Sequence, residues 1–198
     1  MVTVDAGSTH SKAILFKWPK KKPIKLKQVG SCSVEPGISF YGYKNVSDVG
    51  KKLIDCIKKI VKGKVNLKKA PVSLGATAGM RVLKMNDPSK AKTVFSVLMK
   101  NLKKSGFKVK KLGIISGASE GLYAWTTVNF FNGLFSGKGK PYSVVDMGGS
   151  STQMAQFRTK TRYRKRMIKV DVFNKKYSVV SYSNLCFGVK QGFLRYLK

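Results

Sequence analysis

Acidic residues are scarce in this 198-residue chain: eight Asp and Glu stand against 40 Lys and Arg, which gives a formal net charge of +32. One histidine and three cysteines are present, and they lack the spacing of a zinc site. No apolar run approaches the roughly 18 residues needed to cross a bilayer. The N-terminus is not typical of a signal peptide, because Asp5 and His10 interrupt it. We therefore expect a mature domain or a piece of a longer protein.

Hydrophobic residues are plentiful, at 42% of the chain. A chain of this length and composition can bury a core, which excludes a disordered basic tail. Strand patterns alternate with helical patterns, and this order predicts an α/β layered domain. The expected strands are 1–5, 13–18, 24–34, the start of 70–79, 107–117, 142–149, 152–157 and one or two more up to 185; the expected helices are 47–62, 87–104, 119–135 and a start near 188–198.

The scarcity of carboxylates lets each one be considered separately. Asp87 precedes a proline and a helical pattern, which predicts a helix N-cap. Asp48 falls in the first turn of the preceding expected helix and also has an ordinary structural role. Asp5, Glu120 and Asp146 differ, because each lies in a Gly-, Ser- or Thr-rich junction where a strand pattern ends. This placement favours a chemical role for these three residues.

Two segments of the chain repeat one pattern. VTVDAGSTHSKAILF at 2–16 and SVVDMGGSSTQMAQF at 143–157 each contain an apolar strand ending in Asp, then Gly, then hydroxyl residues, then a second apolar strand. Small residues let successive backbone N–H groups face a common anion, and the leading Asp can hold a hydrated divalent cation on that anion. One such turn alone is commonly only a tight turn. Two copies in matching contexts favour a pair of hairpins that clamp a phosphate.

Four motifs resemble those of a known family: DAGSTH at 5–10, GATAGMR at 75–81, ISGASEGLYAW at 115–125 and DMGGSSTQ at 146–153. In order and spacing they resemble the first four signature regions of the ecto-nucleoside triphosphate diphosphohydrolases, the apyrases. The resemblance runs over nearly the whole chain. It implies the ribonuclease H-like fold of the actin, Hsp70 and sugar-kinase superfamily, with a mixed sheet flanked by helices and two phosphate-binding hairpins.

The same resemblance implies hydrolysis of the terminal phosphate of nucleoside tri- and diphosphates with Ca²⁺ or Mg²⁺. Glu120 would be the general base that activates the attacking water. Phosphoryl transfer needs charge neutralisation and an in-line nucleophile more than covalent catalysis, which agrees with such a site. The other implied roles are positioning of that water by Gln153 and Ser151, phosphate binding by the backbones of Ser8, Thr9, His10, Gly149 and Ser150, and metal binding through water by Asp5, Asp146 and Thr77.

Structural alternatives stay open for some of these residues. GATAG alone is typical of a strand-to-helix turn in which Thr77 is an N-cap. Trp125 and Tyr123 lie on the expected helix after Glu120. We expect their side chains to be part of the apolar core, and not to stack on a nucleotide base. The single histidine, His10, is expected to act through its backbone more than through its ring.

The resemblance covers the first of the family's two similar lobes. Residues 1–198 are therefore expected to form a single N-terminal lobe, with the last helix near 188–198 leading toward a second lobe in the same longer chain or in a partner. Cys32 and Cys56 align with a disulfide pair of the animal ecto-enzymes, whereas Cys186 resembles a cysteine whose partner lies in the second lobe. Three reduced, buried cysteines are the alternative. The implied location is extracellular or the secretory-pathway lumen, secreted or tethered to a membrane by segments outside this chain.

The positive charge is concentrated in two runs, residues 17–27 with six lysines and residues 158–169 with seven basic residues. These runs suggest an alternative function, a non-catalytic protein that binds polyanions such as heparan-like glycans or nucleic acid and keeps an apyrase-like shell. A solvated, lysine-rich surface with no dedicated partner is the structural alternative. A relative of the sugar kinases or exopolyphosphatases is a third candidate.

Overall fold

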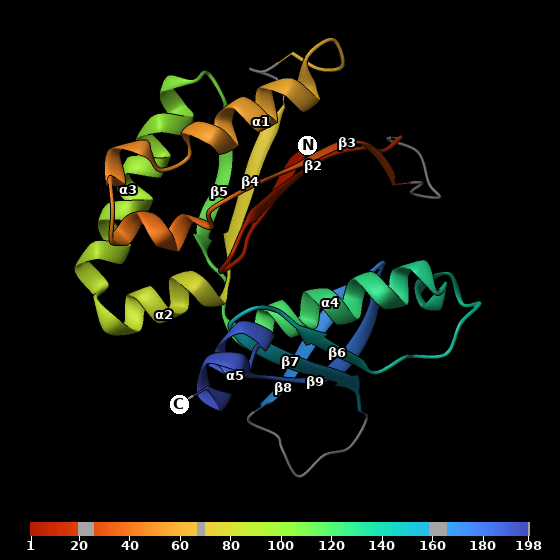
Figure 1. Cartoon of the computed structure of the whole chain (residues 1–198). Coiled ribbons are helices and arrows are strands. Elements are labelled where there is room, and N and C mark those ends of the chain that lie inside the picture. Colours follow the sequence, from red (N-terminus) through yellow and green to blue (C-terminus); the bar gives the residue numbers. More distant parts are fainter. Residues whose placement is uncertain (20–25, 67–69, 159–165, 198) are drawn as a thin grey trace. The chain divides into compact units, whose positions relative to one another are not determined.

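The computed structural model describes residues 1–19, 26–66, 70–158 and 166–197. The chain divides into two compact units, Met1–Ile114 (unit 1) and Ile115–Lys198 (unit 2), each with its own sheet and its own apolar core (Figure 1). That residues 1–198 form a single lobe remains a prediction. Within the described ranges, no helix has the length and hydropathy to span a membrane.

Unit 1 is built on a five-stranded mixed sheet with the order β3-β2-β1-β4-β5. β1 pairs antiparallel with β2 and parallel with β4, and the outer pairs are β2 with β3, antiparallel, and β4 with β5, parallel. Alternate residues of β1, β2 and β4 are buried, as expected when one face of a sheet packs on a core. The strand bounds are β1 Val2–Ala6, β2 Ser11–Lys17, β3 Lys27–Val34, β4 Pro71–Ala76 and β5 Lys108–Ile114.

In the described part of unit 1, three α-helices accompany this sheet: α1 Lys51–Val61, α2 Ala78–Asn86 and α3 Pro88–Lys104. Short 3₁₀ turns, η1 Ile38–Gly42 and η2 Val46–Asp48, precede them (Figure 1). α1 packs on β2 and β3, and α3 packs on β5. The expected helices 47–62 and 87–104 are confirmed, although Asp48 falls in η2 ahead of α1. Asp87 caps α3 as predicted, because its carboxylate accepts the backbone N–H of Lys90 at 2.9 Å.

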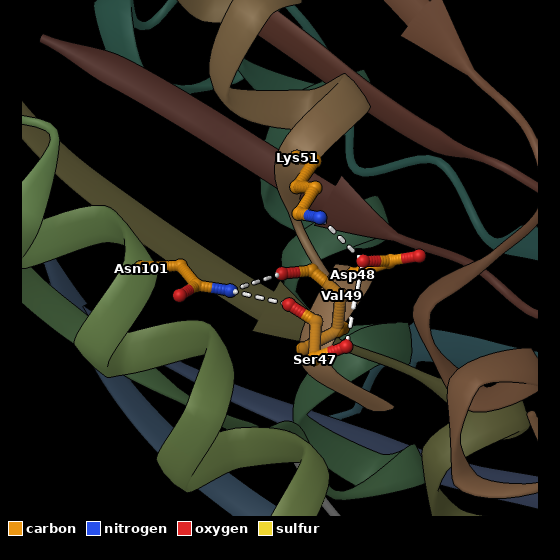
Figure 2. A network of polar contacts seen from close by, with 5 residues as sticks. All are labelled: Ser47, Asp48, Val49, Lys51 and Asn101. Carbon is orange, nitrogen blue, oxygen red and sulfur yellow. Dashed lines mark hydrogen bonds and ion pairs between the residues drawn. The ribbon is translucent and has the colours of Figure 1, made fainter. Parts of the chain in front are cut away.

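A polar contact ties α3 to the turn that precedes α1. Asn101 of α3 donates through its side-chain amide to the carbonyl oxygens of Ser47, at 3.2 Å, and Val49, at 2.9 Å (Figure 2). On the same turn, Asp48 accepts hydrogen bonds from the side chains of Ser47 and Lys51. The chain therefore enters α1 from a turn whose backbone is held by the neighbouring helix.

A disulfide joins Cys32 of β3 to Cys56 of α1, across a sequence separation of 24 residues. This is the pairing that the family resemblance implied. Cys186 is a free, half-buried thiol. The bond cross-links the outer strand of the sheet to the helix that covers it, so unit 1 has a covalent tie in addition to its apolar core.

Unit 2 contains a four-stranded antiparallel sheet with the order β6-β7-β9-β8, and α4 packs on β6, β7 and β9. Trp125 of α4 is fully buried and contacts the rings of Phe135 and Tyr177, so its expected place in the core is confirmed. Tyr123 is 49% exposed, which contradicts the same expectation. The bounds are α4 Gly117–Phe131, η4 Leu134–Ser136, β6 Val144–Met147, β7 Ser151–Phe157, β8 Met167–Val172, β9 Lys175–Leu185 and α5 Val189–Tyr196.

Candidate active site

The two sequence repeats fold into hairpins with the same loop length. Four residues separate the last cross-strand pair of each hairpin: residues 7–10 follow the pair of Ala6 with Ser11, and residues 148–151 follow the pair of Met147 with Thr152. We call these segments the hairpin loops, although Ser151 also belongs to β7 through its pairing with β9. In each unit a further strand pairs antiparallel with the second hairpin strand, β3 on β2 and β9 on β7. The internal repeat therefore extends from the sequence pattern to the backbone topology.

The aspartate of each hairpin has an equivalent position. Asp5 pairs with Lys12 across the first hairpin, and Asp146 pairs with Gln153 across the second. Both aspartates are exposed. Lys12, also exposed, thus occupies in the first hairpin the place that Gln153 holds in the second. The sequence analysis did not single out Lys12. The pattern that could have identified it is its position seven residues after Asp5, which matches the position of Gln153 seven residues after Asp146.

The loop of the first hairpin lies against the start of α2. The backbone N–H of Thr77 donates to the carbonyl oxygen of Ala6 at 3.1 Å, and a Cβ atom added to Gly79 would lie 2.7 Å from the Cα of Ser8. Thr77 occupies the N-cap position of α2, yet within the described residues its side chain makes no capping hydrogen bond. Its buried hydroxyl instead lies 3.5 Å from the carbonyl oxygen of Ala6. The motifs DAGSTH and GATAGMR therefore form one surface of unit 1.

Glu120 lies in the first turn of α4 and is half-buried. Ser116 caps this helix by accepting the backbone N–H of Ser119 at 3.1 Å. The next residue after Glu120, Gly121, packs on the sheet, since an added Cβ would lie 3.3 Å from the Cβ of Gln153. The helix end that carries Glu120 is thus in direct contact with the strand that carries Gln153.

Gln153 is held by two hydroxyl groups. Its side-chain nitrogen donates to the Oγ atoms of Ser151, at 2.6 Å, and Ser183, at 2.7 Å, and only 1% of the residue is exposed. With both N–H bonds of the amide engaged, the oxygen Oε1 is the atom with acceptor capacity left for a water molecule. Ser183 was missed from the sequence, where it is one of two serines in the run SYSN of β9.

The loop of the second hairpin is clamped by the segment after β9. A Cβ added to Gly188 would lie 2.4 Å from the carbonyl oxygen of Gly148 and from the backbone nitrogen of Ser150. Three backbone N–H groups donate to successive carbonyl oxygens of this loop: Cys186 to Ser150 at 2.7 Å, Val189 to Gly148 at 3.0 Å and Gln191 to Gly149 at 3.1 Å. This clamp fixes the loop conformation, and the sequence analysis did not assign it a role.

The predicted site residues therefore fall into two groups. Asp5, Ser8, Thr9, His10 and Thr77 gather at one end of the unit 1 sheet; Glu120, Asp146, Gly149, Ser150, Ser151 and Gln153 gather in unit 2. That the two groups form one site remains a prediction. Within the described ranges, no group of three or more His, Cys, Asp or Glu side chains could hold a metal ion directly.

Comparison with known proteins decides the family. All 198 residues match the model of the GDA1/CD39 (nucleoside phosphatase) family. The chain belongs to this family. It is 31% identical over 210 residues to ectonucleoside triphosphate diphosphohydrolase 1 of Mus musculus, covering 96% of the chain and 41% of that protein. It is 34% identical over 214 residues to ectonucleoside triphosphate diphosphohydrolase 2 of Gallus gallus, covering 99% of the chain and 43% of that protein. The chain thus spans about two fifths of the length of these curated relatives, and the resemblance stated above is confirmed.

Solved structures of low sequence identity share the fold of this nucleoside phosphatase family member. A Ppx/GppA protein of Aquifex aeolicus matches with a TM-score of 0.54 at 19% identity, covering 91% of this chain and 50% of that one. An exopolyphosphatase from Cytophaga hutchinsonii matches with a TM-score of 0.54 at 14% identity, covering 98% of this chain and 52% of that one. The predicted α/β, actin-like fold class is confirmed.

Proposed function

We propose that this nucleoside phosphatase family member hydrolyses the terminal phosphate of nucleoside tri- and diphosphates. The observation that supports this most strongly is the arrangement in unit 2. Gln153 lies opposite Asp146, is held by Ser151, and packs on α4 at Gly121, the residue after Glu120. A water-orienting amide, a metal-binding carboxylate and a general base would then share one end of one sheet.

In this proposal a water molecule attacks the terminal phosphorus and Glu120 accepts its proton. The bond from that phosphorus to the bridging oxygen breaks, which releases inorganic phosphate and a nucleotide with one phosphate fewer. The Oε1 atom of Gln153 accepts a hydrogen bond from the same water, and Ser151 supports that orientation. The phosphates bind the backbone N–H groups of the two hairpin loops, from Ser8, Thr9 and His10 in one and from Gly149 and Ser150 in the other. Lys12 would add a positive charge beside the first loop.

A divalent cation, Ca²⁺ or Mg²⁺, would be held through its water shell by Asp5 and Asp146, with Thr77 assisting. When bound, the ion supplies positive charge that neutralises the phosphate oxygens during transfer. Both aspartates are exposed at the ends of their hairpins, which leaves room for a hydrated ion. Because Asp5 and Asp146 would hold the cation through water molecules, we expect its affinity for the protein without nucleotide to be weak.

The whole-protein properties of the relatives are also proposals here. The chain covers 41% to 43% of the two ectonucleoside triphosphate diphosphohydrolases described above. We infer that a second lobe, in a longer chain or a partner, supplies recognition of the nucleotide base. We also propose an extracellular or lumenal location, in keeping with the prefix in the relatives' names and with the Cys32–Cys56 disulfide.

The test is release of phosphate from ATP and ADP in the presence of Ca²⁺ or Mg²⁺, by the wild-type protein and by Glu120→Gln. General-base removal should lower the rate by roughly 10²–10⁴-fold. Glu35→Gln is the matched control, because Glu35 is exposed and lies outside both hairpins; its rate should equal that of the wild type. Equal rates for wild type and Glu120→Gln would remove Glu120 from the mechanism.

A second candidate function is binding of polyanions, which the net charge of +32 favours. The runs 17–27 and 158–169 suggested it, and residues 20–25 and 159–165 of these runs lie outside the described residues. Heparin and DNA affinity should then fall steeply as salt rises, because phosphate or sulfate contacts release counterions. A shallow salt dependence would contradict this function.

A further inference from the structure

We propose that unit 1 has a second binding pocket, for an anion that carries an extended apolar group, such as a monoacyl phosphate. The pocket has a volume of about 690 Å³ and is lined by residues of β2, β3 and the segment after α1. That volume lies within the range of sites for small molecules. The pocket is at the end of the hairpin marked by Met1 and Phe16, whereas the loop 7–10 is at the other end. Five residues of β1 at about 3.3 Å each separate the two by roughly 17 Å.

Apolar residues make up much of the lining of the pocket. Leu15, which is fully buried, contributes to it, and so do Phe16, Trp18, Val29 and Val65. Trp18 is 43% exposed, which is a large uncovered aromatic surface. Burial of this surface by a hydrocarbon chain would be favourable at about 25 cal/mol per Å².

The charged residues of the pocket are all cationic. Lys17, Lys27 and Lys64 belong to its lining, and the described lining residues include no Asp or Glu. Lys64 donates to the carbonyl oxygen of Val29 at 2.7 Å, so its ammonium group is held at the pocket and keeps further N–H donors for a ligand.

The two features together select the ligand class. A neutral hydrocarbon would leave the three ammonium groups without a counter-charge. A glycan or nucleic-acid backbone would place polar groups against the apolar lining residues, Trp18 among them. An amphiphilic anion matches both the lysines and the apolar lining residues, with its head group at the lysines and its hydrocarbon chain against the apolar side chains.

Titration of the protein with dodecyl phosphate, below its micelle concentration, tests the proposal. The sequence has two tryptophans, and the other, Trp125, is fully buried in unit 2. Binding should therefore shift the Trp18 emission to shorter wavelength, and Trp18→Phe should abolish the response. Dodecyl maltoside, which has the chain without the charge, and inorganic phosphate, which has the charge without the chain, should both bind at least about tenfold more weakly.

Charge-matched variants separate the pocket from the general positive field. The triple variant Lys17→Ala, Lys27→Ala, Lys64→Ala should weaken dodecyl phosphate binding roughly tenfold or more. The control variant Lys92→Ala, Lys100→Ala, Lys103→Ala removes three exposed lysines of α3 and should leave the affinity unchanged. An equal loss in both variants would overturn the proposal, since net charge alone would then explain binding.

Vesicles distinguish a free ligand from a membrane surface. Vesicles of phosphatidylserine and of phosphatidylcholine are added to the protein with and without dodecyl phosphate. Displacement of dodecyl phosphate by phosphatidylserine vesicles would support a pocket that takes the same chemistry from a bilayer. Binding to those vesicles with no response to dodecyl phosphate would overturn the pocket in favour of surface adsorption. None of these measurements depends on nucleotide hydrolysis.

Discussion

Gly188 and Ser150 are in backbone contact: a Cβ atom added to Gly188 would lie 2.4 Å from the backbone nitrogen of Ser150. The residue before α5 therefore has to be glycine for the second hairpin loop to keep its conformation. Because the φ of Gly188 is −92°, the requirement is one of space and not of backbone torsion.

We predict that Gly188→Ala displaces the loop 148–151 and lowers the free energy of unfolding by roughly 1–3 kcal/mol. Nucleotide affinity should fall as well, because this loop would bind phosphate. Gly192→Ala is the matched control, since a Cβ there meets nothing within 4 Å and alanine favours a helix interior. Urea unfolding and nucleotide titration measure both effects. If Gly188→Ala and Gly192→Ala behave alike, the clamp does not hold the loop.

Ser183→Ala removes one of the two acceptors of the Gln153 amide. A buried N–H without a partner costs roughly 1–3 kcal/mol, so we expect that loss of stability. Asn184→Ala, an exposed neighbour on β9, serves as control. The diagnostic measurement is the side-chain amide signal of Gln153 by nuclear magnetic resonance, which should move in Ser183→Ala. Restoration of the signal by Ser183→Thr would support a hydroxyl acceptor, and an unchanged signal in Ser183→Ala would contradict it.

The sequence predicted the strands, most helices and both hairpins, because periodicity and glycine-rich turns are local signals. It did not predict α2 at Ala78–Asn86. The first residues of α2 belong to a motif that also suits a turn, and Asp87, which ends α2, is also the N-cap of α3. Tyr123 was assigned to the core because α4 is apolar around its whole circumference, and sequence alone does not show which side the sheet covers. Ser183 and Gly188 were missed because their contacts, with Gln153 and Ser150, span about 30 residues or more of chain.

The Cys32–Cys56 disulfide should stabilise unit 1 mainly by restricting its unfolded chain. For a loop of this size, with a separation of 24 residues, the expected contribution is about 3 kcal/mol. The double variant Cys32→Ser, Cys56→Ser should therefore unfold at lower urea concentration than the wild type. Cys186→Ser, which changes a free thiol, should not. A reducing agent should lower the stability of the wild type and leave the double variant unaffected; equal sensitivity would contradict the assignment.

Asp87 should contribute to the acid sensitivity of unit 1. The backbone N–H of Lys90 is the main cause that holds the pKa of Asp87 below its ordinary value, and the Lys90 side chain adds to it. A lowered pKa contributes stability above the unfolded pKa of about 3.9 that is lost as the pH falls through the folded pKa. Asp87→Asn keeps a capping oxygen but does not titrate. Its free energy of unfolding should fall less than that of the wild type between about pH 5 and about pH 2.5. Parallel pH profiles would exclude this role.

The central claim, that the hairpin loops 7–10 and 148–151 bind one nucleotide with one metal ion, is tested most directly with Mn²⁺ and a non-hydrolysable ATP analogue. The paramagnetic ion broadens the amide signals of residues close to it. The account predicts that the amides of Ser8, Thr9, Gly149 and Ser150 broaden together, and that Asp146→Asn reduces the effect at both loops. Broadening at one loop alone, with the other unaffected at saturating nucleotide, would contradict the account.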